Sequence, residues 1–401
     1  MVRKTFKYVV IGGGLAGCNA VEGIRSLDTT GSILLTGEEK HLPYDRPPLT
    51  KKLWFGKKTV EEIFVHDRQY FIDNNVDVVL DTMVVGINAA DKTITCKDGS
   101  TYQYEKLLLA TGGTPRRLPI EGGNLEEIYY YRYLDDFLRL KSQVHEETGA
   151  LVIGGGFIGS EIAAALNINK ADVTMLVRES YLVEHVFANK LGNAIQEKYI
   201  RRGVKIFTQD SPVSITKRNK HLVTRTKGGK EISSDVIIAG IGIEPEVKLA
   251  KSAGLAVENG IVVNEFLQSS SPDIYAAGDN ANFPYQVFGK RMRVEHWDNA
   301  VNQGKTAGMN MAGARNAYTY MPYFFSDLFD FGYEAVGLVS SKLETFADWQ
   351  KENDTGVVYY FENGKVRGAM MCNVWNKVDA ARELIKNNER LTVAQLQGAV
   401  K

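Results

Sequence analysis

Near the N-terminus, the hydrophobic positions outline a strand, a glycine-rich turn, a helix and a second strand. An apolar run covers residues 8–11, the turn covers 12–17, a helical pattern covers 18–26, and a second apolar run covers 32–36. This order is typical of half of a βαβ unit. We therefore expect a parallel sheet to begin here.

The same order of elements recurs in the middle of the chain. A strand is expected at 150–153, a turn at 154–159, a helix at 160–169 and a strand at 172–177. The recurrence predicts a duplicated nucleotide-binding fold.

The remaining pattern divides the chain into further segments. Further strands are expected at 77–87, 91–96, 106–110, 204–207, 235–239, 274–277, 356–362 and 365–372, with helices at 297–311 and 378–387. Residues 111–113 are a hinge candidate, 240–245 close the second repeat, and 261–279 return the chain to the first domain. We predict a discontinuous first domain (1–117 and 243–318), an inserted second domain (118–242) and a C-terminal α+β domain (319–401).

Composition narrows the class of protein. The 401 residues carry 48 Lys and Arg against 48 Asp and Glu, so the neutral balance gives no reason to expect nucleic acid or an anionic membrane as a partner. The longest apolar stretches, such as 239–243, fall far short of a membrane span. The chain enters its first strand within a few residues, without a recognisable targeting peptide, although a removed targeting segment stays open. A cytoplasmic protein is expected.

The first glycine turn fits the dinucleotide fingerprint G-x-G-x-x-G. Gly12 permits a tight turn, Gly14 lets backbone amides approach a pyrophosphate, and Gly17 lets helix and strand pack closely. Glu38 follows at about the distance at which an acid binds the adenosine ribose. Alone, this pattern could also be a glycine-rich turn beside a surface glutamate.

The second glycine turn repeats the fingerprint with Gly154, Gly156 and Gly159, and chance matching of both turns is improbable. Two dinucleotides are therefore expected. Arg178 and Glu179 end the following strand, where a carboxylate favours NAD and an arginine accommodates NADP. The sequence leaves this choice open, with NADH favoured.

Five segments carry a resemblance to a known family. They are residues 43–51, 110–116, 154–161, 275–279 and 294–300. The chain resembles the FAD-dependent pyridine nucleotide reductases, and within them apoptosis-inducing factor and the reductases of ferredoxin, rubredoxin and putidaredoxin. The resemblance implies two Rossmann-like domains of the glutathione-reductase type, followed by a C-terminal α+β domain.

The resemblance also implies roles for individual residues. Arg46 would face the FAD diphosphate, and Lys51 would lie near flavin N5, where a cation favours the reduced anion. Glu161 would lie near the nicotinamide and pair with Lys51; the alternative is two unrelated surface charges. Asp279 would bind the ribityl chain, and could also cap a helix.

An aromatic residue opens the predicted helix at 297–311. In the electron-carrier reductases the residue equivalent to Trp297 lies against the isoalloxazine and is a candidate relay; a core Trp without a redox role is the alternative. This helix would direct its positive N-terminus at the flavin. Phe325 stands where the family usually has Trp near the flavin, or is interface core. Residues 331–338 are closer to apoptosis-inducing factor than to the ferredoxin reductases.

The candidate residues form three sets. The catalytic candidates are Lys51, Glu161 and Trp297. The residues expected at FAD are Gly12, Gly14, Leu15, Ala16, Gly17, Glu38, Arg46, Lys51, Val84, Ala110, Thr111, Gly112, Arg116, Asp279, Glu295, His296, Trp297 and Phe325. Those expected at NAD(P)H are Gly154, Gly156, Phe157, Ile158, Gly159, Glu161, Arg178, Glu179 and Gly242. No metal ligands are expected.

The positions of the cysteines indicate whether electrons could leave the flavin through a disulfide. Cys18, Cys96 and Cys372 lie far apart, and Cys18 is expected to pack in the core. The disulfide-reductase and NADH-oxidase branches carry cysteine after the first ribose acid, but residues 40–51 contain none. We therefore expect no redox-active disulfide.

The expected activity is FAD-dependent NAD(P)H oxidation, with electrons passed to a small ferredoxin- or rubredoxin-like carrier or to another one-electron acceptor such as a quinone. An NADH-sensing flavoprotein like apoptosis-inducing factor is the alternative, as is a plain dehydrogenase with one nucleotide. The sequence does not decide whether the protein forms a homodimer.

Overall fold

The computed structural model describes residues 4–400 and divides into two compact units. The first contains the residues up to Asp45 together with Val60–Thr114 and Glu244–Pro322. The second contains Arg46–Thr59, Pro115–Ile243 and the residues from Tyr323 onward. Each unit is therefore assembled from three separate stretches of the chain. The predicted division into three domains stays a prediction.

The first unit is built on a mostly parallel sheet. Its strands are β3 (Val76–Val79), β2 (Ile33–Thr36), β1 (Lys4–Ile11), β6 (Thr101–Leu109), β5 (Thr93–Cys96) and β4 (Val84–Asn88), in that order, with β18 (Ile274–Ala276) also beside β6. The pairs β1–β2, β1–β6, β2–β3 and β18–β6 are parallel. Every side chain of β2 is buried, as expected where a sheet is covered on both faces. The chain thus returns to this sheet from far along the sequence through β18.

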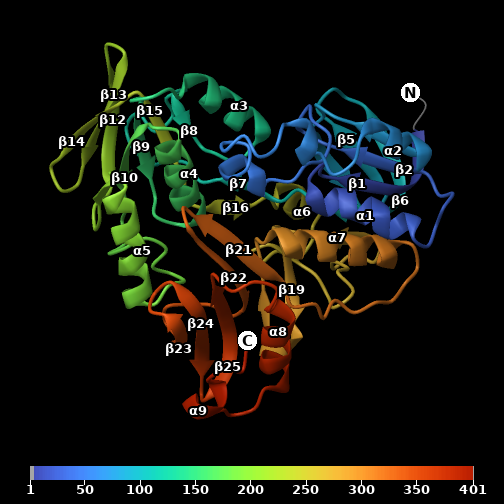
Figure 1. Ribbon diagram of the computed structural model, residues 1–401. Helices are drawn as coiled ribbons and strands as arrows, with labels where there is room; N and C mark the ends of the chain where they lie inside the picture. The colour runs from blue at the N-terminus through green and yellow to red at the C-terminus, as the bar shows by residue number, and fades with distance from the viewer. Residues whose placement is uncertain (1–3, 401) are drawn as a thin grey trace. The chain divides into compact units, whose positions relative to one another are not determined.

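Two helices of the first unit pack unusually closely. Helix α1 (Leu15–Arg25) lies beside α7 (Trp297–Met311), as Figure 1 shows in blue and orange. A Cβ on Gly304 would lie 2.2 Å from the carbonyl oxygen of Ala16, and one on Gly308 would lie 2.1 Å from that of Ala20. Larger residues would therefore push the helices apart.

Short elements complete the first unit. They are η2 (Glu61–Ile63), α2 (Arg68–Asp73), α6 (Lys248–Ser252), β17 (Ile261–Val262), β19 (Ala281–Tyr285), η3 (Gln286–Phe288) and β20 (Lys290–Met292). The short strands β7 (Gly113–Pro115) and β16 (Ile243–Pro245) fall where the chain passes from one unit to the other.

The second unit contains its own parallel sheet. The strand order is β11 (Lys205–Phe207), β10 (Asp172–Leu176), β9 (Gly149–Ile153), β15 (Val236–Ala239) and β8 (Ile128–Tyr129). Its helices are α3 (Leu134–Gln143), α4 (Phe157–Ile168) and α5 (Asn189–Arg201), and η1 (Pro47–Thr50) lies against α4. An antiparallel sheet, β12 (Pro212–Arg218), β13 (His221–Thr226) and β14 (Glu231–Ser234), joins the same core through Ile215, Leu222 and Ile232.

The C-terminal part of the second unit is antiparallel. Its sheet runs in the order β21 (Tyr323–Leu328), β22 (Phe331–Gly337), β25 (Lys365–Cys372), β24 (Thr355–Glu362) and β23 (Glu344–Lys351). Helix α8 (Val378–Asn387) packs on β22 and β25, and the short α9 (Val393–Leu396) follows. The α/β class with a C-terminal α+β part is confirmed.

Several predicted boundaries were wrong. Helices α1 and α4 begin at Leu15 and Phe157, three residues before the predicted starts, because the second half of each fingerprint forms the first helical turn. The single strand predicted at 77–87 is two strands, separated by a turn in which Asp81 has a φ of 51°. The predicted helix at 297–311 and the strand at 365–372 have the predicted bounds.

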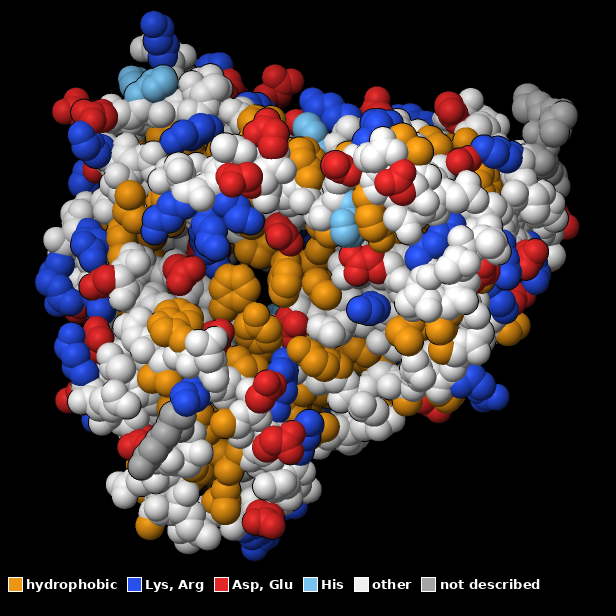
Figure 2. Space-filling model, turned by 45° about the vertical axis from the view of Figure 1, so that its right-hand side comes forward, with side chains coloured by type: hydrophobic (Ala, Val, Ile, Leu, Met, Phe, Trp, Pro, Cys, Tyr) orange, Lys and Arg blue, Asp and Glu red, His pale blue; other side chains and the backbone are white. Residues whose placement is uncertain are grey.

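Charges of both signs are interspersed over the face that Figure 2 shows. This distribution agrees with the balance of 48 basic and 48 acidic residues. On this face, charges of one sign are not gathered into a field of the kind that attracts a polyanion.

Candidate functional site

The three fingerprint glycines of the first turn differ in what surrounds them. Gly12 has a φ of 123°, and a Cβ on it would lie 2.1 Å from the Ala110 carbonyl oxygen. A Cβ on Gly17 would lie 2.1 Å from the carbonyl oxygen of Gly12. A Cβ on Gly14 would meet no protein atom within 4 Å. The fold itself requires Gly12 and Gly17, whereas Gly14 leaves open space at the start of α1.

The second glycine turn repeats this division. A Cβ on Gly154 would lie 2.4 Å from the Gly240 carbonyl oxygen, and one on Gly159 would lie 2.1 Å from that of Gly154. Gly156, like Gly14, has nothing within 4 Å of its added Cβ. Both open positions immediately precede a helix, where backbone amides and the helix dipole attract phosphate. The residues of both turns therefore fit a dinucleotide pyrophosphate.

Two amide side chains behind the first turn were missed by the sequence reasoning. Asn280 and Gln303 are completely buried. Asn280 Nδ2 donates to the Leu109 carbonyl and to Thr111 Oγ1, and Gln303 Oε1 accepts from the Gly278 amide. The opposite amide atoms, Asn280 Oδ1 and Gln303 Nε2, have no partner among the described residues. Because buried polar atoms are normally satisfied, these atoms fit a polar ligand in the first unit.

Further residues expected at FAD lie in or beside three different strands of the first unit. Glu38 is exposed just beyond β2, and Val84 is buried at the start of β4. Thr111 Oγ1 donates to the Glu246 carbonyl at 2.8 Å, next to Ala110 and Gly112.

Asp279 does not cap a helix. It is followed by strand β19 instead, so the suggested capping role was wrong. Its carbonyl accepts from Arg293 Nη1 at 2.8 Å, and the same nitrogen donates to Glu295 Oε1. A role at the ribityl chain stays a prediction.

The start of α7 holds a half-buried indole. Trp297 Nε1 donates to Asp45 Oδ1 at 2.7 Å, which fixes the orientation of the ring. The relay role and the alternative of a core Trp without a redox role both stay predictions. Desolvation lowers the pKa of His296, the N-cap of α7, to about 4, so this imidazole is neutral at pH 7.

The second unit brings Lys51 and Glu161 together. Lys51 Nζ lies 3.0 Å from Glu161 Oε1, and each side chain is only 7% exposed. The pair joins the segment after η1 to helix α4. The alternative of two unrelated surface charges was therefore wrong.

Two hydroxyl groups missed from the sequence complete this cluster. Thr50 Oγ1 donates to Glu161 Oε2, and Ser326 Oγ donates to Glu161 Oε1, both at 2.5 Å. The ring of Phe325 lies under the Lys51 ammonium, with 4.4 Å from Nζ to the ring centroid. Serine and threonine carry no signal in the sequence that distinguishes them from turn or surface residues. Their positions become informative only when the carboxylate that they contact is known.

Arg46 and Arg116 also belong to the second unit. The Arg46 guanidinium lies 5.3 Å from the centroid of the Tyr133 ring. Arg116 is exposed, its Nε donates to the Ile243 carbonyl, and its amide donates to the Gly242 carbonyl. Their contacts with FAD, and that of Gly242 with NAD(P)H, stay predictions.

The strand end of the second glycine unit holds one partly buried carboxylate. Glu179 is 18% exposed, and its Oε1 lies 3.1 Å from Arg178 Nη2 and 3.5 Å from His185 Nε2. Arg178 is 78% exposed. At the start of α4, Phe157 is partly exposed and Ile158 is 42% exposed. His185 was not anticipated from the sequence.

All three cysteines are free and buried. Burial raises the pKa of Cys18 to about 12, and burial also raises the pKa of Cys96 and Cys372. Thiols of this kind are poor nucleophiles at neutral pH. The expectation that Cys18 packs in the core is confirmed.

These features define a class of protein. Two parallel sheets each carry a strand, a glycine turn and a helix, and each turn leaves room for a phosphate group. The fold and its turns are those of a protein that binds two dinucleotides.

Comparisons with known proteins agree. A family model described as pyridine nucleotide-disulphide oxidoreductase matches residues 6–304, and a model for the C-terminal part of mitochondrion-associated apoptosis-inducing factor matches residues 307–355. Apoptosis-inducing factor 1 of Dictyostelium discoideum is 34% identical, covering 99% of this chain and 81% of its own. A rubredoxin-NAD(+) reductase of Pseudomonas putida is 35% identical, covering 80% and 83%. The crystal structure of a covalent putidaredoxin reductase–putidaredoxin complex has a TM-score of 0.92 at 29% identity, covering 99% of this chain and 96% of that one.

The chain belongs to the pyridine nucleotide-disulphide oxidoreductase family. It is an oxidoreductase whose cofactors are FAD and NAD(P)H. It differs from the family's name in one respect, since its cysteines form no disulfide. The resemblance stated from the sequence is confirmed.

Within residues 4–400, no helix is both long enough and apolar enough to cross a membrane. No group of three or more His, Cys, Asp or Glu side chains in the same range is placed to hold a metal ion.

Proposed function

We propose that the protein oxidises NADH and passes the electrons from FAD, one at a time, to a small iron-sulfur carrier protein. The observation that carries this proposal is the state of the cysteines, which are all buried thiols without a disulfide. A thiol relay is therefore lacking, and the flavin is left as the group that delivers electrons. Relatives named as rubredoxin-NAD(+) reductase and putidaredoxin reductase support an acceptor of this kind.

The first glycine turn would hold the FAD pyrophosphate. Gly14 gives the phosphates access to the amides at the start of α1, while Asn280 and Gln303 offer buried polar atoms behind the turn. Bound FAD supplies the two-electron to one-electron conversion that nicotinamide lacks. The chain's own residues would bind and orient the two cofactors and polarise the flavin.

Lys51 and Glu161 would tune the reaction. A fixed ammonium near flavin N5 favours the reduced anion, and Glu161 holds that ammonium in place. Because both groups are buried, their interaction is less screened than at a surface. Trp297, with its indole fixed by Asp45, is the proposed relay toward the acceptor.

The second glycine turn would hold NADH. The partly buried Glu179 carboxylate can accept hydrogen bonds from the adenosine ribose, which favours NADH. It also draws the guanidinium of Arg178 to itself, which leaves that group less available to the 2′-phosphate of NADPH. We therefore infer a preference for NADH.

Anaerobic titration of the purified holoprotein tests this proposal. NADH should bleach the visible absorption band of the flavin, and ferredoxin or rubredoxin should restore it more quickly than oxygen does. A colourless protein, or a flavin that NADH does not reduce, would contradict the assignment of both nucleotide sites.

A second function has support of its own. Residues 307–355 match the C-terminal model of apoptosis-inducing factor, and the Dictyostelium relative aligns with nearly the whole chain. This function is an NADH sensor whose long-lived charge-transfer state controls oligomerisation. Slow turnover with every acceptor, a persistent long-wavelength band and a larger mass on size-exclusion chromatography after NADH addition would favour it. Fast carrier reduction at unchanged mass would exclude it.

Four further assignments are also proposals, and each needs a measurement of its own. They are the division into three domains, the formation of a homodimer, a quinone-type electron acceptor and a cytoplasmic location.

A further inference from the structure

The Glu161 carboxylate accepts from three side chains at once. Its Oε2 accepts from Thr50, while its Oε1 is shared by Ser326 and the Lys51 ammonium. Ser326 is 1% exposed and Thr50 is 3% exposed. Solvent therefore has little access to replace a hydroxyl that is removed.

We propose that Ser326, assisted by Thr50, is a positioning residue that sets how strongly Glu161 neutralises Lys51. This inference rests on the proposed function, in which Lys51 favours reduced flavin. It assigns to the C-terminal strand β21 a role in the chemistry of the second unit.

The argument begins with the shared oxygen. The Ser326 hydroxyl and the Lys51 ammonium both bind Glu161 Oε1, at 2.5 Å and 3.0 Å. A hydroxyl that donates to a carboxylate takes up part of its negative charge. Without Ser326, more of that negative charge acts on Lys51. The Lys51 cation then stabilises the reduced flavin less.

Strand β21 contacts both members of the ion pair. Ser326 binds Glu161, while the neighbouring Phe325 places its ring 4.4 Å from Lys51 Nζ. Phe325 thus has a physical partner in this unit, because an aromatic face attracts a cation. The strand fixes the anion and the cation through consecutive residues.

Thr50 differs from Ser326 in having a second acceptor within reach. Its Oγ1 lies 2.5 Å from Glu161 and 3.3 Å from the Pro47 carbonyl. Its proton can therefore turn away from Glu161 within η1. We expect the Thr50 hydroxyl to contribute less than that of Ser326.

The test compares Ser326→Ala with Ser326→Thr in the FAD-loaded protein. Ser326→Ala should slow flavin reduction by NADH about three- to tenfold, which is less than the full effect of one hydrogen bond to a charged group because Ser326 acts through Glu161 and Lys51. It should also make the FAD midpoint potential more negative, while the NADH dissociation constant stays unchanged. Ser326→Thr keeps a hydroxyl and should restore both the rate and the potential.

Ser234→Ala is the matched control. Ser234 is 3% exposed in the same unit, and its hydroxyl has no hydrogen-bond partner among the described residues. This variant measures the general effect of removing a buried hydroxyl. A midpoint potential that stays at the wild-type value in Ser234→Ala and falls in Ser326→Ala supports the positioning role.

The contrary outcomes are distinct. A wild-type rate and potential in Ser326→Ala would overturn the positioning role and leave the proposed function standing. A wild-type protein that NADH fails to reduce would overturn the proposed function itself. If Ser326→Ala does not fold, Thr50→Val carries the same test: a slower reduction with a more negative potential supports the inference, and wild-type values overturn it.

Discussion

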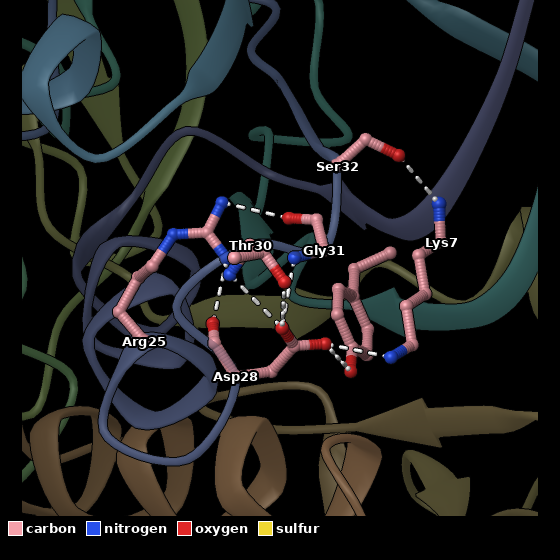
Figure 3. Close-up of polar contacts among 7 residues, drawn as sticks. Lys7, Arg25, Asp28, Thr30, Gly31 and Ser32 are labelled. Atoms are coloured by element: carbon pink, nitrogen blue, oxygen red, sulfur yellow. Dashed lines mark hydrogen bonds and ion pairs between the residues drawn. The ribbon is translucent and has the colours of Figure 1, made fainter.

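Asp28 and Glu161 are both carboxylates with a lysine partner and further donors, but they are assembled in opposite ways. Asp28 lies in the loop between α1 and β2 (Figure 3) and accepts from its own loop and from β1. Its five donors are Lys7 Nζ, the Tyr8 hydroxyl, the amides of Thr30 and Gly31, and the Thr30 hydroxyl. Arg25 extends this network by donating to the carbonyls of Asp28 and Gly31. All four residues that donate to the Asp28 carboxylate lie within 21 positions of it in the sequence.

Glu161 is held by residues far apart in the sequence. Its partners Thr50 and Ser326 are 111 and 165 positions away. Its three donors, Thr50, Lys51 and Ser326, are all side chains; Thr50 and Lys51 are neighbours in the chain, and Ser326 lies in β21. We propose that the carboxylate bound by local amides serves stability, whereas the one held by distant side chains serves the chemistry.

The largest expected effect comes from breaking the Glu161 cluster. Glu161→Leu leaves the Lys51 ammonium buried without its anion, and should lower the free energy of unfolding by about 3–5 kcal/mol. Adding Lys51→Met should recover part of this loss, because two apolar side chains replace two charges. Urea unfolding measures Glu161→Leu, Lys51→Met and the double variant. A double variant that loses the sum of the two single effects would contradict the pairing.

The contrast between structural and ligand-facing positions also exists within the first glycine turn. Gly17→Ala places a Cβ 2.1 Å from the Gly12 carbonyl and should cost about 1–3 kcal/mol of stability. Gly14→Ala enters open space, so it should keep the fold and lose FAD affinity by roughly 5- to 100-fold. Thermal unfolding of the apoprotein and FAD titration separate the two. Unchanged FAD affinity in Gly14→Ala would show that the pyrophosphate does not lie there.

Asp28 should control acid stability rather than catalysis. The hydrogen bond from Lys7, followed by those from Gly31 and Tyr8, holds the pKa of Asp28 well below its usual range. Since the folded-state pKa is lowered, this stabilisation is present above the unfolded value of about 4 and declines as the pH falls below it. Asp28→Asn should lose about 1–2 kcal/mol at pH 7 and flatten the decline in acid.

Unfolding curves between pH 7 and pH 3, with NADH oxidation rates at pH 7, check this prediction. A loss of activity without a loss of stability in Asp28→Asn would reverse the comparison with Glu161.

The smallest effects are expected at Glu179, a carboxylate with exposed partners. Glu179→Ala should weaken NADH binding about tenfold, and Arg178→Ala should weaken NADPH binding by a similar or smaller factor. Stability should change by less than about 0.5 kcal/mol. Kinetics with both nucleotides give the answer, and an unchanged preference in both variants would place the ribose elsewhere.

Local patterns in the sequence predicted the elements that form from neighbouring residues. Both glycine turns, the helix at 297–311 and the strand at 365–372 were found this way. Helices α3 and α5 were not identified, nor was the β12–β14 sheet, although Ile215, Leu222 and Ile232 bury against one core. The strands of that sheet carry many polar residues, so their pairing is decided by contacts with the parallel sheet.

The residues of the candidate site were harder to predict from the sequence than the elements of the fold. The Lys51–Glu161 pair came from resemblance, because no spacing rule connects residues so distant in the chain. Thr50, Ser326, Asn280 and Gln303 were missed, since uncharged polar residues are common in turns and on surfaces. Burial is what makes them informative, and burial is a property of the folded chain.

Anaerobic stopped-flow spectroscopy tests the central claim most directly. The NADH-reduced protein would be mixed with oxidised ferredoxin, rubredoxin, a quinone or oxygen, while the flavin absorbance is followed. The account predicts that an iron-sulfur carrier reoxidises the flavin faster than oxygen does, with two carrier molecules reduced per flavin. Reoxidation by oxygen that is faster than by every carrier and quinone would contradict it.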